Sequence, residues 1–317
     1  MAANGTSTVG VQRLQVPADR DGQRLDNFLL GLLKGAPRSL VYRICRSGEV
    51  RVNGRRARPD TRLAGGDEVR IPPVRLAAAD EPAEAPRPLL ERIERAIVHE
   101  DRHLLVLDKP SGIASHGGSG VRHGAIELLR AARPGQTLEL VHRLDRDTSG
   151  LLLLAKKRST LAALQALMRE GGVEKRYLAL LVGNLRRPAV EVDAPLRKSV
   201  LQGGERMVRV DAAGKDSVSR FRVLGRPGGH SYVEVAIETG RTHQIRVHAA
   251  HLGHPVAGDP KYGDAEANRT LRGLGLRRLF LHAASLRFRL PDRDEETVLD
   301  APLPQELKAV LQRLEGA

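Results

Sequence analysis

Residues 141–156 read V-H-R-L-D-R-D-T-S-G-L-L-L-L-A-K, and this stretch decides how the rest of the chain is interpreted. Its second half is an unbroken apolar run behind Gly150, which is typical of a short, fully buried strand. Its first half places five ionisable side chains within six positions: His142, Arg143, Asp145, Arg146 and Asp147. Unpaired charges beside a core are costly. The pattern therefore predicts that these groups pair or act chemically, with one acid held ionised by a cation.

The two acids of this stretch differ in what their neighbours favour. Asp147 is adjacent to Thr148 and Ser149, where an aspartate usually accepts hydrogen bonds from nearby backbone N–H groups. Asp145 has the same structural alternative, but it is also the better candidate for a catalytic carboxylate. The residues alone leave both interpretations of Asp145 open.

A second cluster reads G-R-T-H-Q-I-R-V-H at residues 240–248. It follows an alternating apolar strand, and we expect Thr242 to cap a helix over residues 242–252. His243 and Arg246 stand three positions apart and would share one helix face, directed into a pocket beside Asp145. The alternative is an ordinary solvated helix face.

Two further motifs carry weaker signals. Tyr177, in K-R-Y at residues 175–177, is either a half-buried strand residue or a ring that stacks on a base, in a chain with few aromatic residues. The glycine-rich segment 108–120 contains D-K-P-S-G and S-H-G-G-S-G. It lacks the last glycine of a dinucleotide fingerprint, since position 123 is His123, and it lacks the Gly-Lys-Ser/Thr of a P-loop.

Charge indicates the class of partner. The chain has 317 residues and a net charge of +14, which favours a polyanion such as nucleic acid or an anionic membrane surface. Residues 1–75 hold 14 Lys/Arg and 7 Asp/Glu, so 14 − 7 gives +7, half of the excess. Mere solubility is the alternative explanation for this charge.

The length favours two domains. We expect a flexible tail at residues 1–15, a basic helix–helix–hairpin unit at 16–72, a proline-rich linker at 73–91 and a second domain at 92–315. In that domain we expect few helices, one of them at residues 159–170, and strands at 103–108, 138–141, 150–156, 174–182, 217–224, 232–238 and 284–290. In the basic unit, seven arginines form what we call the basic ridge: Arg38, Arg43, Arg46, Arg51, Arg55, Arg56 and Arg58.

Several classes are disfavoured. The single cysteine, Cys45, permits no internal disulfide and no multi-cysteine metal site, and the 11 histidines show no metal-binding spacing. Residues 1–10 do not resemble a secretory signal, and no apolar run approaches the roughly 20 residues of a membrane span. We expect a soluble, cytoplasmic protein without metal or cofactor, acting as a monomer and not on membranes.

Taken together, the motifs resemble the RluA family of RNA pseudouridine synthases over nearly the whole chain. The shared motifs are D-K-P-S-G (108–112), H-R-L-D-R-D-T-S-G (142–150), K-R-Y (175–177), G-R-T-H-Q-I-R-V-H (240–248) and L-F-L-H-A (279–283). The N-terminal unit resembles the alpha-L RNA-binding module. Segments 114–120, 140–150 and 201–210 are most similar to the type C members, which modify large-subunit (23S) ribosomal RNA.

The resemblance implies an α+β pseudouridine synthase fold, with a mixed, mostly antiparallel sheet and flanking helices. It implies isomerisation of a flipped-out uridine in ribosomal RNA without a cofactor. Asp145 would act on the ribose as nucleophile or base, Arg246 would keep it ionised, and Tyr177 would stack on the base. Arg143 would fill the space that the uridine leaves. RNA contacts would come from Arg143, Arg241, His243, Lys109 and the basic ridge.

Three alternatives remain at this point. The first is a non-catalytic RNA-binding assembly factor, which would have no need of Asp145, Tyr177 and Arg246 together. The second is a glycosidase or base-excising enzyme, which usually needs a second acid or a water-activating group. The third is a sister synthase that acts on other ribosomal uridines or on transfer RNA.

Overall fold

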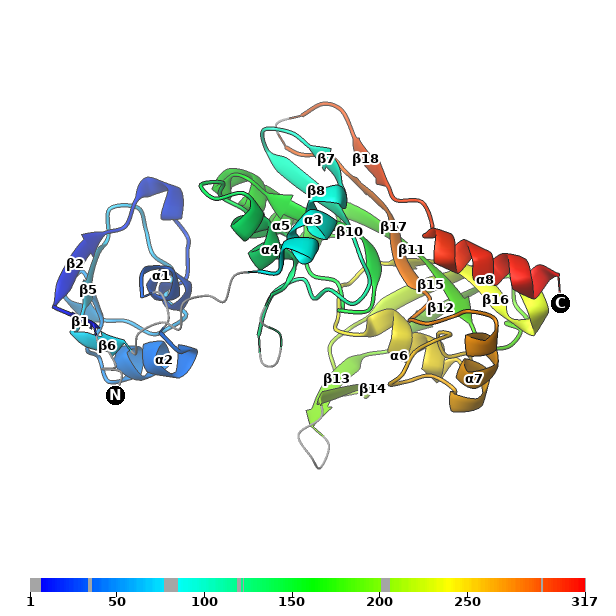
Figure 1. The fold of residues 1–317 in the computed structure, drawn as a ribbon. Coiled ribbons are helices and arrows are strands. Elements are labelled where there is room, and N and C mark those ends of the chain that lie inside the picture. Colours follow the sequence, from blue (N-terminus) through cyan, green and yellow to red (C-terminus); the bar gives the residue numbers. More distant parts are fainter. Residues whose placement is uncertain are drawn as a thin grey trace, which may run out of the picture. The chain divides into compact units, whose positions relative to one another are not determined.

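The computed structural model describes residues 7–33, 36–76, 85–118, 121, 123–200, 206–291 and 293–316. Within it the chain divides into an N-terminal unit, Met1–Ala85, and a C-terminal unit, Pro86–Ala317 (Figure 1). The glycines at 120 and 203–204, which contributed to the resemblance, and residues 77–84 of the predicted linker lie outside the described residues.

The N-terminal unit packs two helices, α1 (Leu25–Leu32) and α2 (Arg38–Arg46), around one small core. A short 3-10 helix, η1 (Ala18–Arg20), precedes α1. The sheet runs in the order β2 (Gln12–Gln15), β5 (Glu68–Ile71), β3 (Arg51–Val52) and β4 (Arg55–Arg56). The turn between β3 and β4 has positive φ at Asn53 (50°) and Gly54 (76°), which confirms the predicted tight hairpin.

Two predicted boundaries of this unit are wrong. Residues 7–15 are not a flexible tail, because β2 pairs with β5, and β1 (Ser7–Val9) pairs with β6 (Val74–Leu76). The predicted linker is also too long, because β6 falls inside it and α3 (Arg87–Arg95) starts before its end. The prolines that suggested a linker are compatible with both elements, since proline is tolerated beside strands and in the first turn of a helix.

The C-terminal unit is built on one mixed sheet. Its order is β12 (Ala189–Asp193), β15 (Val218–Gly225), β16 (Ser231–Ile237), β11 (Val173–Leu181), β17 (Leu281–Phe288), β10 (Ser149–Ala155), β8 (Leu104–Lys109) and β7 (Ile97–Glu100). β9 (Glu139–Leu140) joins β10, and β18 (Thr297–Asp300) joins β17. Of the pairings in this sheet, only β10 with β17 is parallel, so the expected mostly antiparallel α+β architecture is confirmed.

Helices flank this sheet (Figure 1), and they are α3, α4 (Ala125–Ala132), α5 (Arg158–Glu170), α6 (Gln244–His251), α7 (Ala265–Gly273) and α8 (Gln305–Glu315), with a 3-10 turn, η2 (Pro227–Gly229). All seven predicted strands of this unit are present, but the expectation of few helices is wrong. A separate hairpin, β13 (Leu196–Val200) with β14 (Arg206–Val210), was also not predicted.

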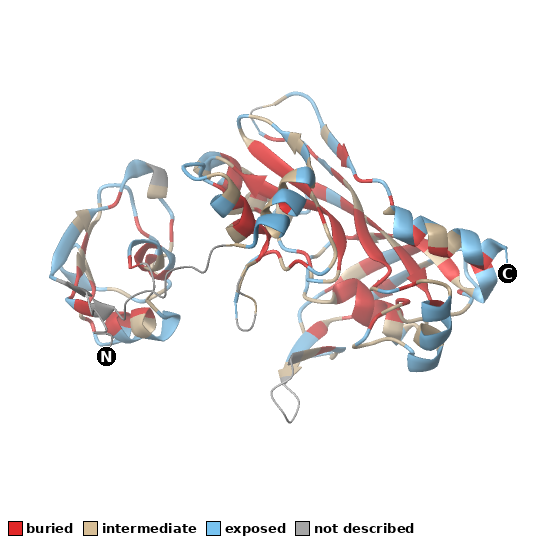
Figure 2. Ribbon diagram, viewed as in Figure 1, coloured by how far each residue is buried: buried red, intermediate tan, exposed pale blue. Residues whose placement is uncertain are grey.

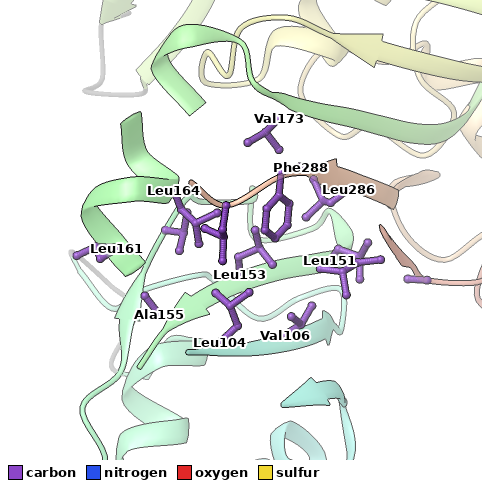
Figure 3. Packing of buried hydrophobic residues seen from close by; sticks show 14 residues of the cluster. Leu104, Val106, Leu151, Leu153, Ala155, Leu161, Leu164, Val173, Leu286 and Phe288 are labelled. Atoms are coloured by element: carbon purple, nitrogen blue, oxygen red, sulfur yellow. The ribbon is translucent and has the colours of Figure 1, made fainter. Parts of the chain in front are cut away.

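The central strand β10 is buried at all seven positions, as its apolar run predicts. Figure 2 shows the burial concentrated on the central strands, with exposed outer helix faces. In Figure 3 the side chains of Leu151 and Leu153 meet Leu104 and Val106 of β8, Phe288 of β17 and the helix that carries Leu161 and Leu164. Gly150 is required at the start of β10, because a Cβ there would lie 2.2 Å from the Ala283 carbonyl oxygen of the parallel strand.

Candidate active site

Asp145 lies in the loop of residues 141–148, which connects β9 to β10. Serine side chains from the segment after β8 hold this loop through hydrogen bonds to its backbone. The Ser115 hydroxyl donates to the Leu144 carbonyl (2.8 Å) and accepts the Leu144 N–H (2.9 Å). The Ser111 hydroxyl donates to the Asp147 carbonyl at 2.7 Å. Asp145 is therefore presented from a loop whose backbone is fixed on both sides of it.

Lys109 is part of this support, and its predicted contact with RNA is wrong. Its side chain is fully buried, and its Nζ donates to the carbonyls of Pro110 (3.0 Å), Ile113 (2.7 Å) and Arg146 (3.1 Å). Burial lowers the pKa of Lys109 to about 7. Three carbonyl acceptors nevertheless match the three N–H groups of an ammonium and stabilise its charge.

Arg246, from the first turn of α6, brings the cation that Asp145 was predicted to need. Its Nη1 donates to Oδ2 of Asp145 at 3.3 Å, across 101 positions of sequence. Its other nitrogens bind Asp259 more tightly, with Nε to Oδ2 at 2.7 Å and Nη2 to Oδ1 at 2.8 Å. The guanidinium also lies over the Tyr262 ring, with Cζ 5.1 Å from its centroid.

The electrostatics of this group follow from burial and pairing. Burial alone would lower the pKa of Arg246, but its hydrogen bonds to Asp259 and the charges of Asp259 and Asp145 raise it. Burial would raise the pKa of Asp259, yet Arg246 and the backbone N–H groups of Lys261 and Tyr262 lower it. Arg246 thus remains a cation, and Asp259 takes the larger share of its hydrogen bonding.

His243 also reaches the site, although not as predicted. Thr242 does not cap the helix: α6 begins at Gln244, and His243 precedes it in a left-handed conformation (φ 56°). Nδ1 of His243 lies 2.8 Å from the Tyr262 hydroxyl, and Nε2 lies 3.9 Å from Oδ2 of Asp145. Burial lowers the pKa of His243, with the Asp145 carboxylate opposing that shift.

Tyr177, on β11, forms part of the wall of the same pocket. Only 9% of it is exposed, and burial, with the nearby Asp145 charge, raises the pKa of its hydroxyl. The pocket of about 70 Å³ is also lined by Asp145, Arg143, Arg246 and Ile237. No described residue donates a hydrogen bond to Oδ1 of Asp145, so this oxygen is available to a bound molecule.

Two larger cavities adjoin this pocket, of about 470 and 430 Å³. All three share Arg143, Gly240 and Arg241 in their walls. The cavity of about 430 Å³ adds Arg197 and Lys198 of β13, with Lys215, and no sequence motif pointed to these three residues. Asp259 and Tyr262 were not predicted either, because neither stands in a pattern that indicates burial beside an arginine far away in the sequence.

The basic ridge lies entirely in the N-terminal unit. Six of its arginines are exposed and Arg51 is half-buried. Arg43 lies 3.8 Å from Glu49, and Arg46 donates to the Tyr42 carbonyl. In the described part of that unit, the side chains of Arg38, Arg55 and Arg58 have no hydrogen-bond or ion-pair partner.

Within the described ranges, no three His, Cys, Asp or Glu side chains are grouped so as to hold a metal ion. None of the helices in those ranges combines the length and apolar character needed to cross a membrane.

Comparison with known proteins identifies both units. The RNA pseudouridylate synthase family matches residues 103–251, and the S4 domain matches residues 23–69. The chain is 52% identical over 318 residues to the ribosomal large subunit pseudouridine synthase C of Escherichia coli (strain K12), covering 98% of this chain and 99% of that protein. It is 49% identical to the Haemophilus ducreyi protein of the same name, covering 99% of each. A solved structure, human RNA pseudouridylate synthase domain containing 4, matches 72% of this chain and 95% of its own with a TM-score of 0.59 and 30% identity.

Proposed function

Because the chain belongs to the RNA pseudouridylate synthase family, we propose that it isomerises specific uridines of large-subunit (23S) ribosomal RNA, with Asp145 acting on the ribose. The observation that carries the assignment of Asp145 is its meeting with Arg246 at 3.3 Å in the pocket that contains Tyr177. The RNA substrate is proposed from the names of the relatives and from the S4 domain.

The reaction requires one carboxylate and side chains that hold the base. The bond between N1 of uracil and C1′ of ribose breaks, the uracil turns, and C5 joins C1′. C5 gives up a proton and N1 gains one, so no electrons are added or removed. Asp145, with Oδ1 available and Oδ2 on Arg246, is placed to attack C1′ or to remove a proton from the ribose.

Arg246 and Tyr177 create the conditions for that step. The Arg246 guanidinium lies against the Asp145 carboxylate and offsets its negative charge. Since Asp259 binds the same guanidinium at 2.7 and 2.8 Å, Arg246 stabilises Asp145 through only one longer hydrogen bond. The carboxylate therefore remains reactive. The Tyr177 ring offers a face for the uracil, and its raised pKa keeps the hydroxyl protonated.

A uridine must leave its stack to reach this pocket, which costs a few kcal/mol. Arg143 is exposed at the pocket edge, and we assign to it the filling of the vacated space. Arg241, Arg197, Lys198 and Lys215 extend the positive wall beside it. The basic ridge would add affinity through RNA phosphates.

Asp145, Arg246 and Tyr177 all come from one chain, which supports catalysis by a monomer. Action in the cytoplasm follows from the proposed ribosomal substrate. A sister synthase acting on other ribosomal or transfer RNA uridines differs only in the positions modified, and an RNA-binding assembly factor would modify none.

The test is to map pseudouridines across ribosomal and transfer RNA in cells with the protein, without it, and with Asp145→Asn. We expect a small set of 23S sites to disappear in both altered strains, while Asp145→Asn protein folds and binds RNA as wild type does. Near wild-type modification by Asp145→Asn would remove Asp145 from the mechanism. Sites lost only from transfer RNA would refute the proposed substrate.

A further inference from the structure

A fourth cavity lies behind the Asp145 loop, and we call it the rear cavity. Its volume is about 690 Å³, larger than any of the three cavities around Asp145 described above. Its wall is formed by the end of β8 and the residues after it, by α7 and the segment that follows, and by the start of α8, with Arg92 of α3. It shares no lining residue with the pocket of Asp145.

The two cavities approach each other at two places, and at the first of these only one chain segment separates them. Where the Asp145 loop meets β10, Asp147 and Ser149 line the rear cavity, whereas Thr148 between them lines the pocket of Asp145. In the segment after α6, Gly258 and Pro260 line the rear cavity. Asp259, between them, instead binds Arg246. A molecule in the rear cavity would therefore touch the reverse side of both segments that hold the catalytic groups.

The rear cavity carries more positive charge than its own acids neutralise. Arg278 pairs with Glu306 at 3.1 Å. Arg272 and Arg277 are exposed at the cavity, and their side chains make no hydrogen bond or ion pair within the described chain. Arg92 makes one long contact, 3.5 Å from Nη2 to the Ser111 carbonyl. Three guanidinium groups are thus free to bind an anion.

A carboxylate completes the lining. Asp108 is half-buried, and its carboxylate has no hydrogen-bond or ion-pair partner among the described residues. Burial raises its pKa, with the charge of Arg278 opposing that shift. Arginines bind phosphate, and a carboxylate accepts hydrogen bonds from hydroxyl or amino groups. Together they match the two ends of a nucleotide. The cavity volume also falls in the range of small-ligand sites, roughly 300–1,000 Å³.

We propose that the rear cavity is a binding site for a nucleotide, with its phosphate on Arg272 and Arg277 and its sugar or base on Asp108. The nucleotide is either free or part of the substrate RNA chain. This site is not part of the proposed function. Only the case in which the nucleotide belongs to the substrate RNA rests on that function.

The test compares the full-length wild type with two variants of equal charge change. Arg272→Gln/Arg277→Gln alters the rear cavity, and Arg287→Gln/Arg289→Gln alters two exposed arginines of the same unit that line none of the four cavities. Calorimetry measures binding of adenosine 5′-monophosphate, which lacks uracil, and of inorganic phosphate. Filter binding of a large-subunit rRNA fragment over a salt series measures the RNA arm.

If free nucleotide is the ligand, adenosine monophosphate binds wild type and control with a Kd on the order of 0.1–1 mM, and the Arg272/Arg277 variant at least tenfold more weakly. If the nucleotide belongs to the RNA, that variant alone lowers the slope of log affinity against log salt by about 1–2. Equal behaviour of the two variants in both arms overturns the proposal. Pseudouridine formation in the same preparations tests the proposed function separately, because it depends on Asp145.

Discussion

Arginines of the two units are used in opposite ways. Arg246 in the C-terminal unit is 5% exposed and is fixed by Asp259, Asp145 and the Tyr262 ring. Arg55 and Arg58 in the N-terminal unit are exposed and have no partner in the described part of the chain. A charge that must act on one atom has to be held in place, whereas charges that capture RNA act best when they remain free to meet phosphates.

The energetics explain this division. A buried guanidinium without partners costs several kcal/mol, so Arg246 requires Asp259 before it can serve Asp145. An exposed arginine is already solvated, and pairing it with a carboxylate contributes only about 0–1 kcal/mol. Leaving the basic ridge unpaired therefore costs the fold little and keeps its charge available for counterion release on RNA binding.

The largest expected effect is that of Asp259→Asn. The amide keeps the size and an oxygen that can accept the N–H groups of Lys261 and Tyr262, but it removes the charge that offsets Arg246. We expect a loss of about 3–5 kcal/mol in the free energy of unfolding, because a buried ion pair is broken from one side. Denaturant unfolding measures it. Turnover should fall at least tenfold, since Arg246 is then released toward Asp145.

The matched control is Glu68→Gln in the N-terminal unit, which breaks the exposed pair with Arg13. We expect a change of no more than about 1 kcal/mol. Equal destabilisation by the two substitutions would show that the contrast between buried and exposed pairs has no energetic basis in this protein.

Local sequence pattern was sufficient to predict several of the features compared above. The apolar run of β10 and the helix spacing of α2 are local, so they predicted the burial of β10 and the helix of residues 38–46 correctly. The motifs also brought Asp145, Tyr177 and Arg246 together as candidates, and the structure places them in one pocket. That they act as proposed stays a prediction.

What local pattern could not predict was pairing over long distances. Lys109 was expected to contact RNA from the family resemblance, and only the fold shows three carbonyls around its Nζ. Residues 7–15 looked like a tail because their strand partners lie more than 50 positions away. Asp259 follows no helix or strand period, so its pairing with Arg246, 13 positions away, could not be predicted from local pattern.

The two units should also differ in how their stability depends on pH. Residues 1–85 contain no histidine, whereas His142 in the C-terminal unit is half-buried and its Nε2 accepts the Leu153 N–H. Burial lowers the pKa of His142 to about 4 from 6.5. Between these pH values the unfolded chain binds the proton and the folded chain does not, so this stability is lost as the pH falls. At pH 5 the loss is about 2 kcal/mol.

His142→Gln should remove that part of the acid sensitivity, because the amide oxygen can accept the same N–H without titrating. Urea unfolding of the C-terminal unit at pH 7 and pH 5 would measure the difference, with His251→Gln at an exposed site as the control. An unchanged pH dependence in His142→Gln would mean that this histidine is not a neutral acceptor of the Leu153 N–H in the folded protein.

The smallest effect is expected from the free arginines themselves. Arg55→Gln/Arg58→Gln should leave folding and the rate at saturating RNA unchanged, because neither side chain has a partner to lose in the described structure. Affinity for a large-subunit rRNA fragment should fall a few-fold at moderate salt. The slope of log affinity against log salt should decrease by about 1–2, one phosphate contact for each charge removed. A variant with lower turnover at saturating RNA and an unchanged salt slope would mean that these arginines contribute to the chemical step. The distinction between fixed arginines that act in catalysis and free arginines that bind RNA would then be wrong for the N-terminal unit.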